Sequence, residues 1–163
     1  MIRLSRSLVG EMEIEAVTTV IRRGFLGMGA EAQCFEQELA SFIGGGISVA
    51  CVNTGTSALH LALQAAGVGP GDEVLVPTLT YVATFQAVSA CGAVPVACDV
   101  SENTGLLDLS DAEKRITPKT RAVIPVHYAS FTGDLDAVYA FAGGHGMRVV
   151  EDAAHAFGCE FKG

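Results

Sequence analysis

The sequence predicts an α/β fold, a mostly parallel sheet with helices on both faces. From residue 47 onward, short apolar runs alternate with helical stretches, the pattern of repeated strand–helix units. The apolar runs lack the polar alternation of a strand with one exposed face, so both faces are expected to be covered. Their spacing along the chain suits right-handed crossover connections.

Residues 1–46 are predicted to form a helical segment ahead of the sheet. In "EMEIEAVTTVIRRG" the apolar residues recur at helical spacing, and Gly24 is the expected stop. A second helix is predicted in "AEAQCFEQELASFIGGG", where Phe35, Leu39 and Phe42 share one stripe and glycines close the element.

Residues 47–163 are predicted to form a partial α/β domain. The expected strands are 47–53, 73–77, 93–99, 121–126 and 147–151, and the expected helices are 56–66, 81–90, 110–116 and 134–142. Ligands of such sheets bind at the carboxyl ends of the strands, so the segments that follow the strands are the candidate sites.

The first strand end reads "VNTGTSALHLALQAAG". Asn53, Thr54 and Thr56 are good capping residues, and Gly55 lets a ligand approach the backbone closely. A small-residue turn that leads into a helix N-terminus can bind an anion through free amide groups and the helix dipole. An ordinary capped helix explains the same residues, and His60, further along, is interpreted as a packing or surface residue.

The second strand end, "VPTLTYVATFQAV", brings an aromatic residue to the same edge. Pro77 ends the strand, and Thr78 or Thr80 is expected to cap the helix that follows. Tyr81 in its first turn either stacks on a planar ligand or covers the core.

The third strand end, "VIPVHYAS", carries His127 and Tyr128. A structural histidine with satisfied hydrogen bonds is favoured here over an acid–base catalyst. The sequence has no His, Cys, Asp or Glu set at metal-ligand spacing, so no metal is expected, and no nucleophile elbow is present.

The fourth strand end, "VVEDAAHAFG", places Asp152 directly after a buried strand, where an unpaired carboxylate is costly. Asp152 therefore either caps the next turn or faces a cation. A protonated pyridine nitrogen is a suitable cation, because the carboxylate keeps the ring protonated and electron-withdrawing. His155 lies close enough in the sequence to contact the same ligand.

Composition excludes several classes of protein. The net charge of −8 argues against nucleic-acid and anionic-membrane partners, and no apolar run is long enough for a membrane span. The cysteines form no paired motif and the first residues contain no signal-peptide core, so a cytoplasmic location with reduced thiols is expected. These cysteines are Cys34, Cys51, Cys91, Cys98 and Cys159.

A loose dinucleotide fingerprint, Gly27-x-Gly29-x-x-Ala32, is not favoured. The helical pattern before it and the pair Arg22-Arg23 argue against the strand that such a fingerprint requires.

Five segments in order resemble the N-terminal portion of the DegT/DnrJ/EryC1/StrS family of pyridoxal-phosphate-dependent sugar aminotransferases. They are "TGTSALHLAL", "GPGDEVLVPTLTYVAT", "GAVPVACDV", "ITPKTRAVIPVHYASFTGDLDAV" and "VVEDAAHAFGCEFKG". The resemblance covers essentially the whole chain. It implies an incomplete large domain of the fold-type I transferases and pyridoxal 5′-phosphate as the cofactor.

The resemblance also implies how the cofactor is held. Backbone amides at Gly55, Thr56 and Ser57 would bind the phosphate, and Tyr81 would stack on the pyridine ring. In the E-D-A-A motif, the aspartate that pairs with the pyridine nitrogen falls on Asp152.

The residue three positions after that aspartate, here His155, would contact the ring hydroxyl. No catalytic residue is assigned, because the Schiff-base lysine of the family follows the E-D-A-A motif at a distance beyond this sequence. Lys114, Lys119 and Lys162 do not match it. The segment 47–53 would also lack its sheet neighbours, so this portion alone is expected to be inactive.

The complete protein would transfer an amino group, commonly from glutamate, to a keto group on a nucleotide-linked sugar, and would form a homodimer. Three alternatives remain at this point. They are a pyridoxal-phosphate-dependent sugar dehydratase on the same scaffold, a non-catalytic remnant or regulatory partner with the same fold, and a dinucleotide-binding oxidoreductase.

Overall fold

The computed structural model describes residues 6–162, which belong to two compact units that meet between Cys51 and Val52. The first unit contains helices α1 (Glu11–Arg23) and α2 (Ala30–Ile43), as the sequence predicts. Gly24 ends α1 in the left-handed conformation with φ of 75°, which confirms the predicted stop. A dinucleotide fingerprint needs a strand before its glycines. Helix α1 continues through Arg23, so Gly27 and Gly29 follow a helix, and this argues against the fingerprint.

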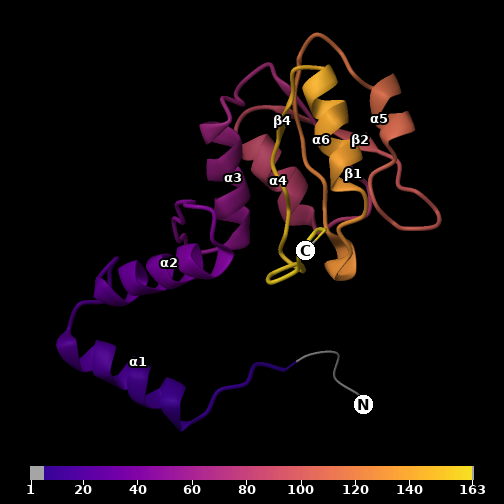
Figure 1. The fold of residues 1–163 in the computed structure, drawn as a ribbon. Coiled ribbons are helices and arrows are strands. Elements are labelled where there is room, and N and C mark those ends of the chain that lie inside the picture. Colours follow the sequence, from indigo (N-terminus) through magenta and orange to yellow (C-terminus); the bar gives the residue numbers. More distant parts are fainter. Residues whose placement is uncertain (1–5, 163) are drawn as a thin grey trace. The chain divides into compact units, whose positions relative to one another are not determined.

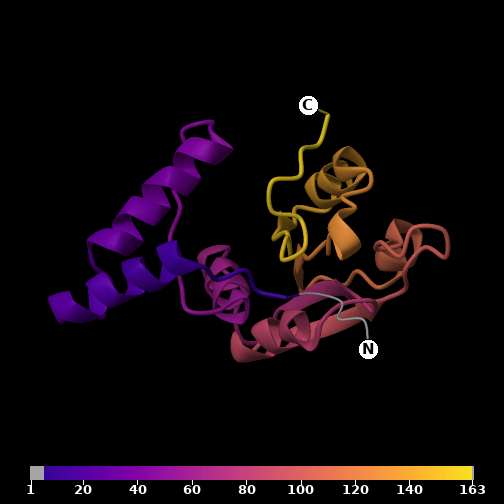
Figure 2. The ribbon, with the colours of Figure 1, turned by 90° about the horizontal axis from the view of Figure 1, so that it is seen from below.

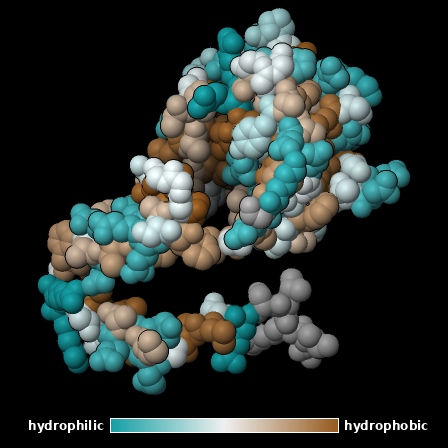
Figure 3. Space-filling view, in the orientation of Figure 1, coloured by the Kyte–Doolittle hydropathy of each residue, from teal (hydrophilic) through white to brown (hydrophobic). Residues whose placement is uncertain are grey.

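Neither helix of the first unit has a fully buried residue. Apolar side chains reach the surface along both helices, where Figure 3 shows them in brown among hydrophilic residues. The larger exposed ones are Met12, Ile14, Val17, Ile21, Phe35, Phe42 and Ile43.

The second unit is built on a four-stranded parallel sheet (Figure 1). The strands, in the spatial order β2-β1-β3-β4, are β2 (Val94–Cys98), β1 (Glu73–Pro77), β3 (Thr120–Val123) and β4 (Arg148–Val149). The helices are α3 (Gly55–Ala65), α4 (Val82–Ala90), α5 (Leu109–Lys114) and α6 (Leu135–Gly144), with a short 3-10 turn η1 (Tyr128–Ser130). The predicted α/β class is confirmed.

Helices cover both faces of this sheet because side chains alternate along each strand. In β1, Val74 and Val76 join one apolar cluster that includes Leu63 of α3 and Val88 of α4. The residue between them, Leu75, joins the opposite cluster with residues of α5 and α6. Figure 2 shows the same layering, with α3 and α4 on one side of the sheet and α6 on the other.

Residues 47–53 do not form the predicted strand, and they have no sheet neighbour among residues 6–162, as the resemblance implied. These residues are irregular, and within the described part of the chain the sheet contains only the four strands above. A strand exists through pairing with a neighbour, and an apolar run without one gains no ladder hydrogen bonds. The other four predicted strands form: residues 73–77 match β1 at both ends, and the ends of the other three differ by one to three residues.

Pairing continues past β3 and β4 and aligns the segments that follow them. The amide of Val150 donates to Val123, that of Asp152 to Pro125, and that of His127 to Asp152. A parallel bridge between Val126 and Asp152 belongs to the same ladder. The third and fourth predicted strand ends therefore lie side by side. No helix in residues 6–162 has the length and apolar character that crossing a bilayer requires.

Candidate functional site

A cavity of about 510 Å³ opens at the carboxyl ends of the strands in the second unit. Five of the six residues singled out from the sequence line it: Gly55, Thr56, Tyr81, Asp152 and His155. They come from the start of α3, the start of α4 and the segment after β4. Gly55 and Asp152 therefore line the same cavity although they lie almost a hundred positions apart in the sequence. Ser57 is the exception, since it does not line the cavity.

The N-terminus of α3 lines part of this cavity. Thr54 is the N-cap, and its hydroxyl oxygen accepts the amide hydrogen of Ser57 at 3.1 Å. That bond occupies the Ser57 amide, whereas the amides of Gly55 and Thr56 belong to the helix turn that has no intrahelical acceptor. A Cβ atom added at Gly55 would meet nothing within 4 Å, so the space over the helix start is open to a ligand.

Tyr81 is the residue at the N-cap position of α4, and it is 78% exposed. Its exposure rejects the interpretation that it covers the core and leaves the ring free to contact a ligand. The predicted cap by Thr78 or Thr80 is wrong, because no side chain caps α4. The Thr80 hydroxyl is engaged instead with that of Thr84, one helical turn further on, at 2.6 Å.

Asp152 is only 9% exposed and has two hydrogen-bond donors. The Thr84 hydroxyl lies 2.8 Å from Oδ2, and the amide of Ala154 lies 3.3 Å from Oδ1. Among residues 6–162 no Lys, Arg or His forms an ion pair with this carboxylate. A buried carboxylate without a cation is costly, and the open side of Asp152 is the cavity.

His155 is exposed at the rim of the cavity, on a turn after Asp152. Its backbone carbonyl accepts a hydrogen bond from the Ser130 hydroxyl, which ties this turn to η1. Its ring lies 6.1 Å from that of Tyr128, measured between centroids. The imidazole is therefore placed by its neighbours without being buried by them.

His127 differs from its sequence-based interpretation as a satisfied structural residue. It is 2% exposed, and its Nε2 atom lies 2.6 Å from Oε2 of Glu151. The other ring nitrogen, Nδ1, is also buried and has no hydrogen-bond partner in the described part of the chain. His127 lines the same cavity as Asp152, and it brings a buried polar atom without a described partner close to that cavity.

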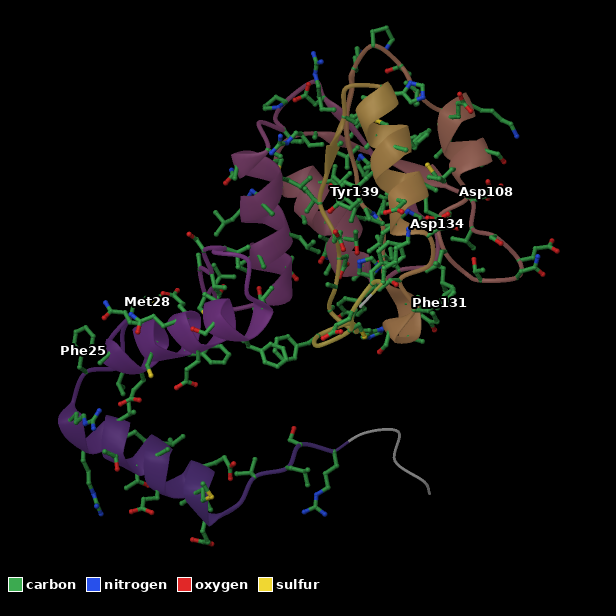
Figure 4. All side chains as sticks on the ribbon, in the orientation of Figure 1. Phe25, Met28, Asp108, Phe131, Asp134 and Tyr139 are labelled. Carbon is green, nitrogen blue, oxygen red and sulfur yellow. The ribbon has the colours of Figure 1, made fainter. Side chains whose placement is uncertain are left out.

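Glu151 connects His127 to Tyr139 of α6, which Figure 4 labels. The hydrogen bond with His127 is the main cause that lowers the pKa of Glu151, and the bond from Tyr139 adds to it. The same carboxylate, together with burial, raises the pKa of Tyr139 to about 12. Glu151 gave no separate signal in the sequence, because its neighbour Asp152 was sufficient to explain the acidic pair.

Thr84 was also missed from the sequence. Its only signal was the four-residue spacing of Thr80 and Thr84, which can bring two hydroxyl groups together around the start of a helix. Nothing in that spacing indicates that Thr84 would meet Asp152, which is 68 residues away.

The cavity thus combines three features: helix amides without intrahelical acceptors, an exposed aromatic ring with apolar walls, and a buried carboxylate. Its apolar walls include Leu59, Leu79 and Val126. Among residues 6–162 no cluster of His, Cys, Asp or Glu could hold a metal ion. Pyridoxal phosphate fits this set of groups, because it carries a phosphate, a flat ring and a basic ring nitrogen.

Fold and cavity define the class: an α/β protein with a cavity at the carboxyl ends of a parallel sheet, where proteins of this class bind ligands. The chain matches the DegT/DnrJ/EryC1/StrS aminotransferase family over residues 8–163, and it belongs to this family. The resemblance identified from its motifs is therefore confirmed.

Three relatives illustrate the match. The chain is 45% identical over 158 residues to the spore coat polysaccharide biosynthesis protein SpsC of Bacillus subtilis (strain 168), covering 97% of this chain and 40% of SpsC. The crystal structure of S. venezuelae DesV in complex with a ketimine intermediate is 42% identical with a TM-score of 0.80, over 90% of this chain and 40% of that one. NtdA from Bacillus subtilis, solved with bound cofactor PMP, is 32% identical with a TM-score of 0.81, over 86% and 32%. The chain spans less than half the length of each relative.

Proposed function

We propose that this chain is the cofactor-binding portion of a pyridoxal-phosphate-dependent aminotransferase that acts on keto sugars. The observation that carries the proposal is Asp152, a buried carboxylate without a described cationic partner, which faces the same cavity as the N-terminus of α3. The family match and the bound cofactor of NtdA support the choice of pyridoxal phosphate. When bound, this cofactor supplies an electron sink for reactions of amino compounds.

Each residue has a distinct task in this proposal. The amides of Gly55 and Thr56 bind the phosphate, and the Tyr81 ring stacks on the pyridine ring. The Asp152 carboxylate accepts a hydrogen bond from the protonated ring nitrogen and so keeps that nitrogen charged. His155, at the rim, donates to the ring hydroxyl. Ser57 contributes less than the sequence suggested, because its amide already donates to Thr54.

The lysines of this chain are proposed to take no part in the chemistry. Lys114, Lys119 and Lys162 are absent from the lining of the cavity, and Lys162 forms an ion pair with Asp136. The chain is therefore proposed to bind the cofactor without a covalent bond, and to be inactive without a lysine from elsewhere.

The relatives support the substrate class that we propose. SpsC is described as a spore coat polysaccharide biosynthesis protein, which favours a sugar as the amino acceptor. We infer a nucleotide-linked keto sugar as the acceptor, an amino acid such as glutamate as the donor, and a homodimer as the working assembly of the complete enzyme.

The experiment is a titration of the purified chain with pyridoxamine 5′-phosphate (PMP), which needs no lysine, followed by Tyr fluorescence and calorimetry. We expect saturable binding at one site. Asp152→Asn should weaken it roughly 10- to 150-fold, the equivalent of one hydrogen bond to a charged group. Asp99→Asn is the matched control, since Asp99 also follows a strand directly but lies outside the cavity.

Two further arms test the phosphate end and the lysines. Pyridoxamine, which lacks the phosphate, should bind much more weakly than PMP if the α3 amides hold that group. After borohydride reduction with pyridoxal phosphate, no lysine should be labelled stoichiometrically. Equal loss of affinity in Asp152→Asn and Asp99→Asn would contradict the proposed site, and full labelling of one lysine would contradict non-covalent binding.

A further inference from the structure

Thr84 is fully buried in the first turn of α4, and its hydroxyl group has three close neighbours. Its Oγ1 atom lies 2.8 Å from Oδ2 of Asp152, 2.6 Å from the Thr80 hydroxyl and 3.2 Å from the backbone carbonyl of Tyr81. Thr84 does not line the cavity, so any effect on a ligand must pass through another residue.

The chemistry of these groups gives the hydrogen bonds a direction. An ionised carboxylate and a backbone carbonyl only accept hydrogen bonds, whereas a hydroxyl group carries one hydrogen and can also accept. Thr84 therefore has one hydrogen for two pure acceptors, and the closer and charged one is Asp152. Thr80 is the only one of the three neighbours that can donate, so the chain of hydroxyl groups runs from Thr80 through Thr84 to Asp152.

This chain leaves the two carboxylate oxygens of Asp152 unequal. Oδ2 accepts a short bond from a buried hydroxyl that is itself polarised by a second hydroxyl. Oδ1 has only the amide of Ala154 at 3.3 Å, which is a long contact. Oδ1 is therefore the oxygen with capacity left for a ligand, and Oδ2 fixes the plane of the carboxylate.

We propose that Thr84 is a positioning residue that keeps the ring nitrogen of the ligand protonated through Asp152, with Thr80 as its supporting donor. The hydroxyl stabilises the anionic form of Asp152, so the shared proton resides on the ring nitrogen rather than on the carboxylate. Without that donor, the proton moves toward Asp152 or is lost to solvent. This inference rests on the proposed binding of pyridoxal phosphate at the cavity.

The test uses the intact chain and PMP labelled with ¹⁵N at the ring nitrogen, whose chemical shift reports whether that nitrogen carries a proton. Spectra are recorded at one pH, chosen above the value at which the ring nitrogen of free PMP loses its proton in the same buffer. Thr84→Val removes the hydroxyl and keeps the side-chain shape, and Thr84→Ser keeps the hydroxyl and removes a methyl group. Near-ultraviolet circular dichroism of each variant checks its fold.

In the wild-type chain we expect the signal of a protonated ring nitrogen. Thr84→Val should move the signal at least a third of the way toward the unprotonated position and weaken PMP binding about tenfold. Thr84→Ser should retain the wild-type signal, and Thr80→Ala should shift it in the same direction as Thr84→Val by a smaller amount. A purely structural role for Thr84 would lower affinity without moving the signal of the ligand that remains bound.

An unchanged signal in a folded Thr84→Val variant would overturn the inference and leave the cofactor site intact. If Thr84→Val does not fold, Thr80→Ala decides, and an unmoved signal there overturns the inference equally. If the wild-type chain itself does not bind PMP, the proposed function fails, and this inference fails with it.

Discussion

Replacement of Glu151 by Gln tests whether the polar chain beside the cavity stabilises the fold through charge. Glu151 accepts hydrogen bonds from His127 at 2.6 Å and from Tyr139, and 31% of its side chain is exposed. Since an ionised carboxylate only accepts, Nε2 of His127 must carry the hydrogen of that bond. Gln removes the charge and replaces one acceptor oxygen by an amide NH₂ group.

The expected cost follows from what Gln can still do. Its remaining oxygen can accept one of the two bonds, and its NH₂ group can donate to the Tyr139 hydroxyl after that hydroxyl rotates. The net loss is therefore about one charge-assisted hydrogen bond that is partly screened by solvent. We expect the free energy of unfolding to fall by about 1–2 kcal/mol at neutral pH.

The pH dependence has a definite sign. The hydrogen bond from His127 holds the pKa of Glu151 below its usual value in the folded chain. The stabilisation is then fully present above the unfolded pKa, which is about 4.3, and is lost as the pH falls through the folded pKa. The difference between wild type and Glu151→Gln should therefore be constant near neutral pH and shrink below about pH 4.

The assay is urea unfolding followed by circular dichroism at a series of pH values. Glu160→Gln is the matched control, because Glu160 is exposed and its side chain forms no hydrogen bond or ion pair among residues 6–162. A cost at neutral pH no larger than that of Glu160→Gln would refute the reasoning. So would a difference that grows as the pH falls.

Two further predictions concern the sheet and its connections. Gly92 has φ of +76°, and an added Cβ would lie 3.0 Å from Cγ of Pro70, so Gly92→Ala should lower the free energy of unfolding by roughly 1–2 kcal/mol. Gly143 lies in α6, and an added Cβ would meet nothing within 4 Å, so Gly143→Ala should be neutral or stabilising by up to about 1 kcal/mol. Equal changes in the free energy of urea unfolding for Gly92→Ala and Gly143→Ala would contradict this reasoning. Burial raises the pKa of the Cys98 thiol to about 11, so at pH 8 iodoacetamide should modify exposed Cys159 well before Cys98. Mass spectrometry of partly alkylated chain measures the order, and equal rates would show that Cys98 is accessible.

Much of the architecture could be predicted from local patterns. Val74, Leu75 and Val76 are apolar in succession, which already requires cover on both faces of the strand, and the structure places them in two opposite clusters. The glycine at position 24 predicted the end of α1, because a left-handed residue at a helix end favours glycine. The apolar character of segment 47–53 predicted a strand that does not form. Apolar character is a local property, whereas a strand also needs a hydrogen-bonded neighbour, and no residue within the segment specifies one.

The candidate site also has features that local sequence patterns predict and features that depend on tertiary packing. Local patterns were enough to identify the chemical groups concerned: the small-residue helix start at Gly55, the aromatic at Tyr81 and the acid at Asp152. The packing of the elements brings these groups to the lining of one cavity and leaves Ser57 outside it. It alone brought Thr84 to Asp152 and His127 to Glu151, across 68 and 24 residues of chain. Hydrogen bonds depend on distances of a few tenths of an ångström between such remote groups, and the pairing of parallel strands sets those distances.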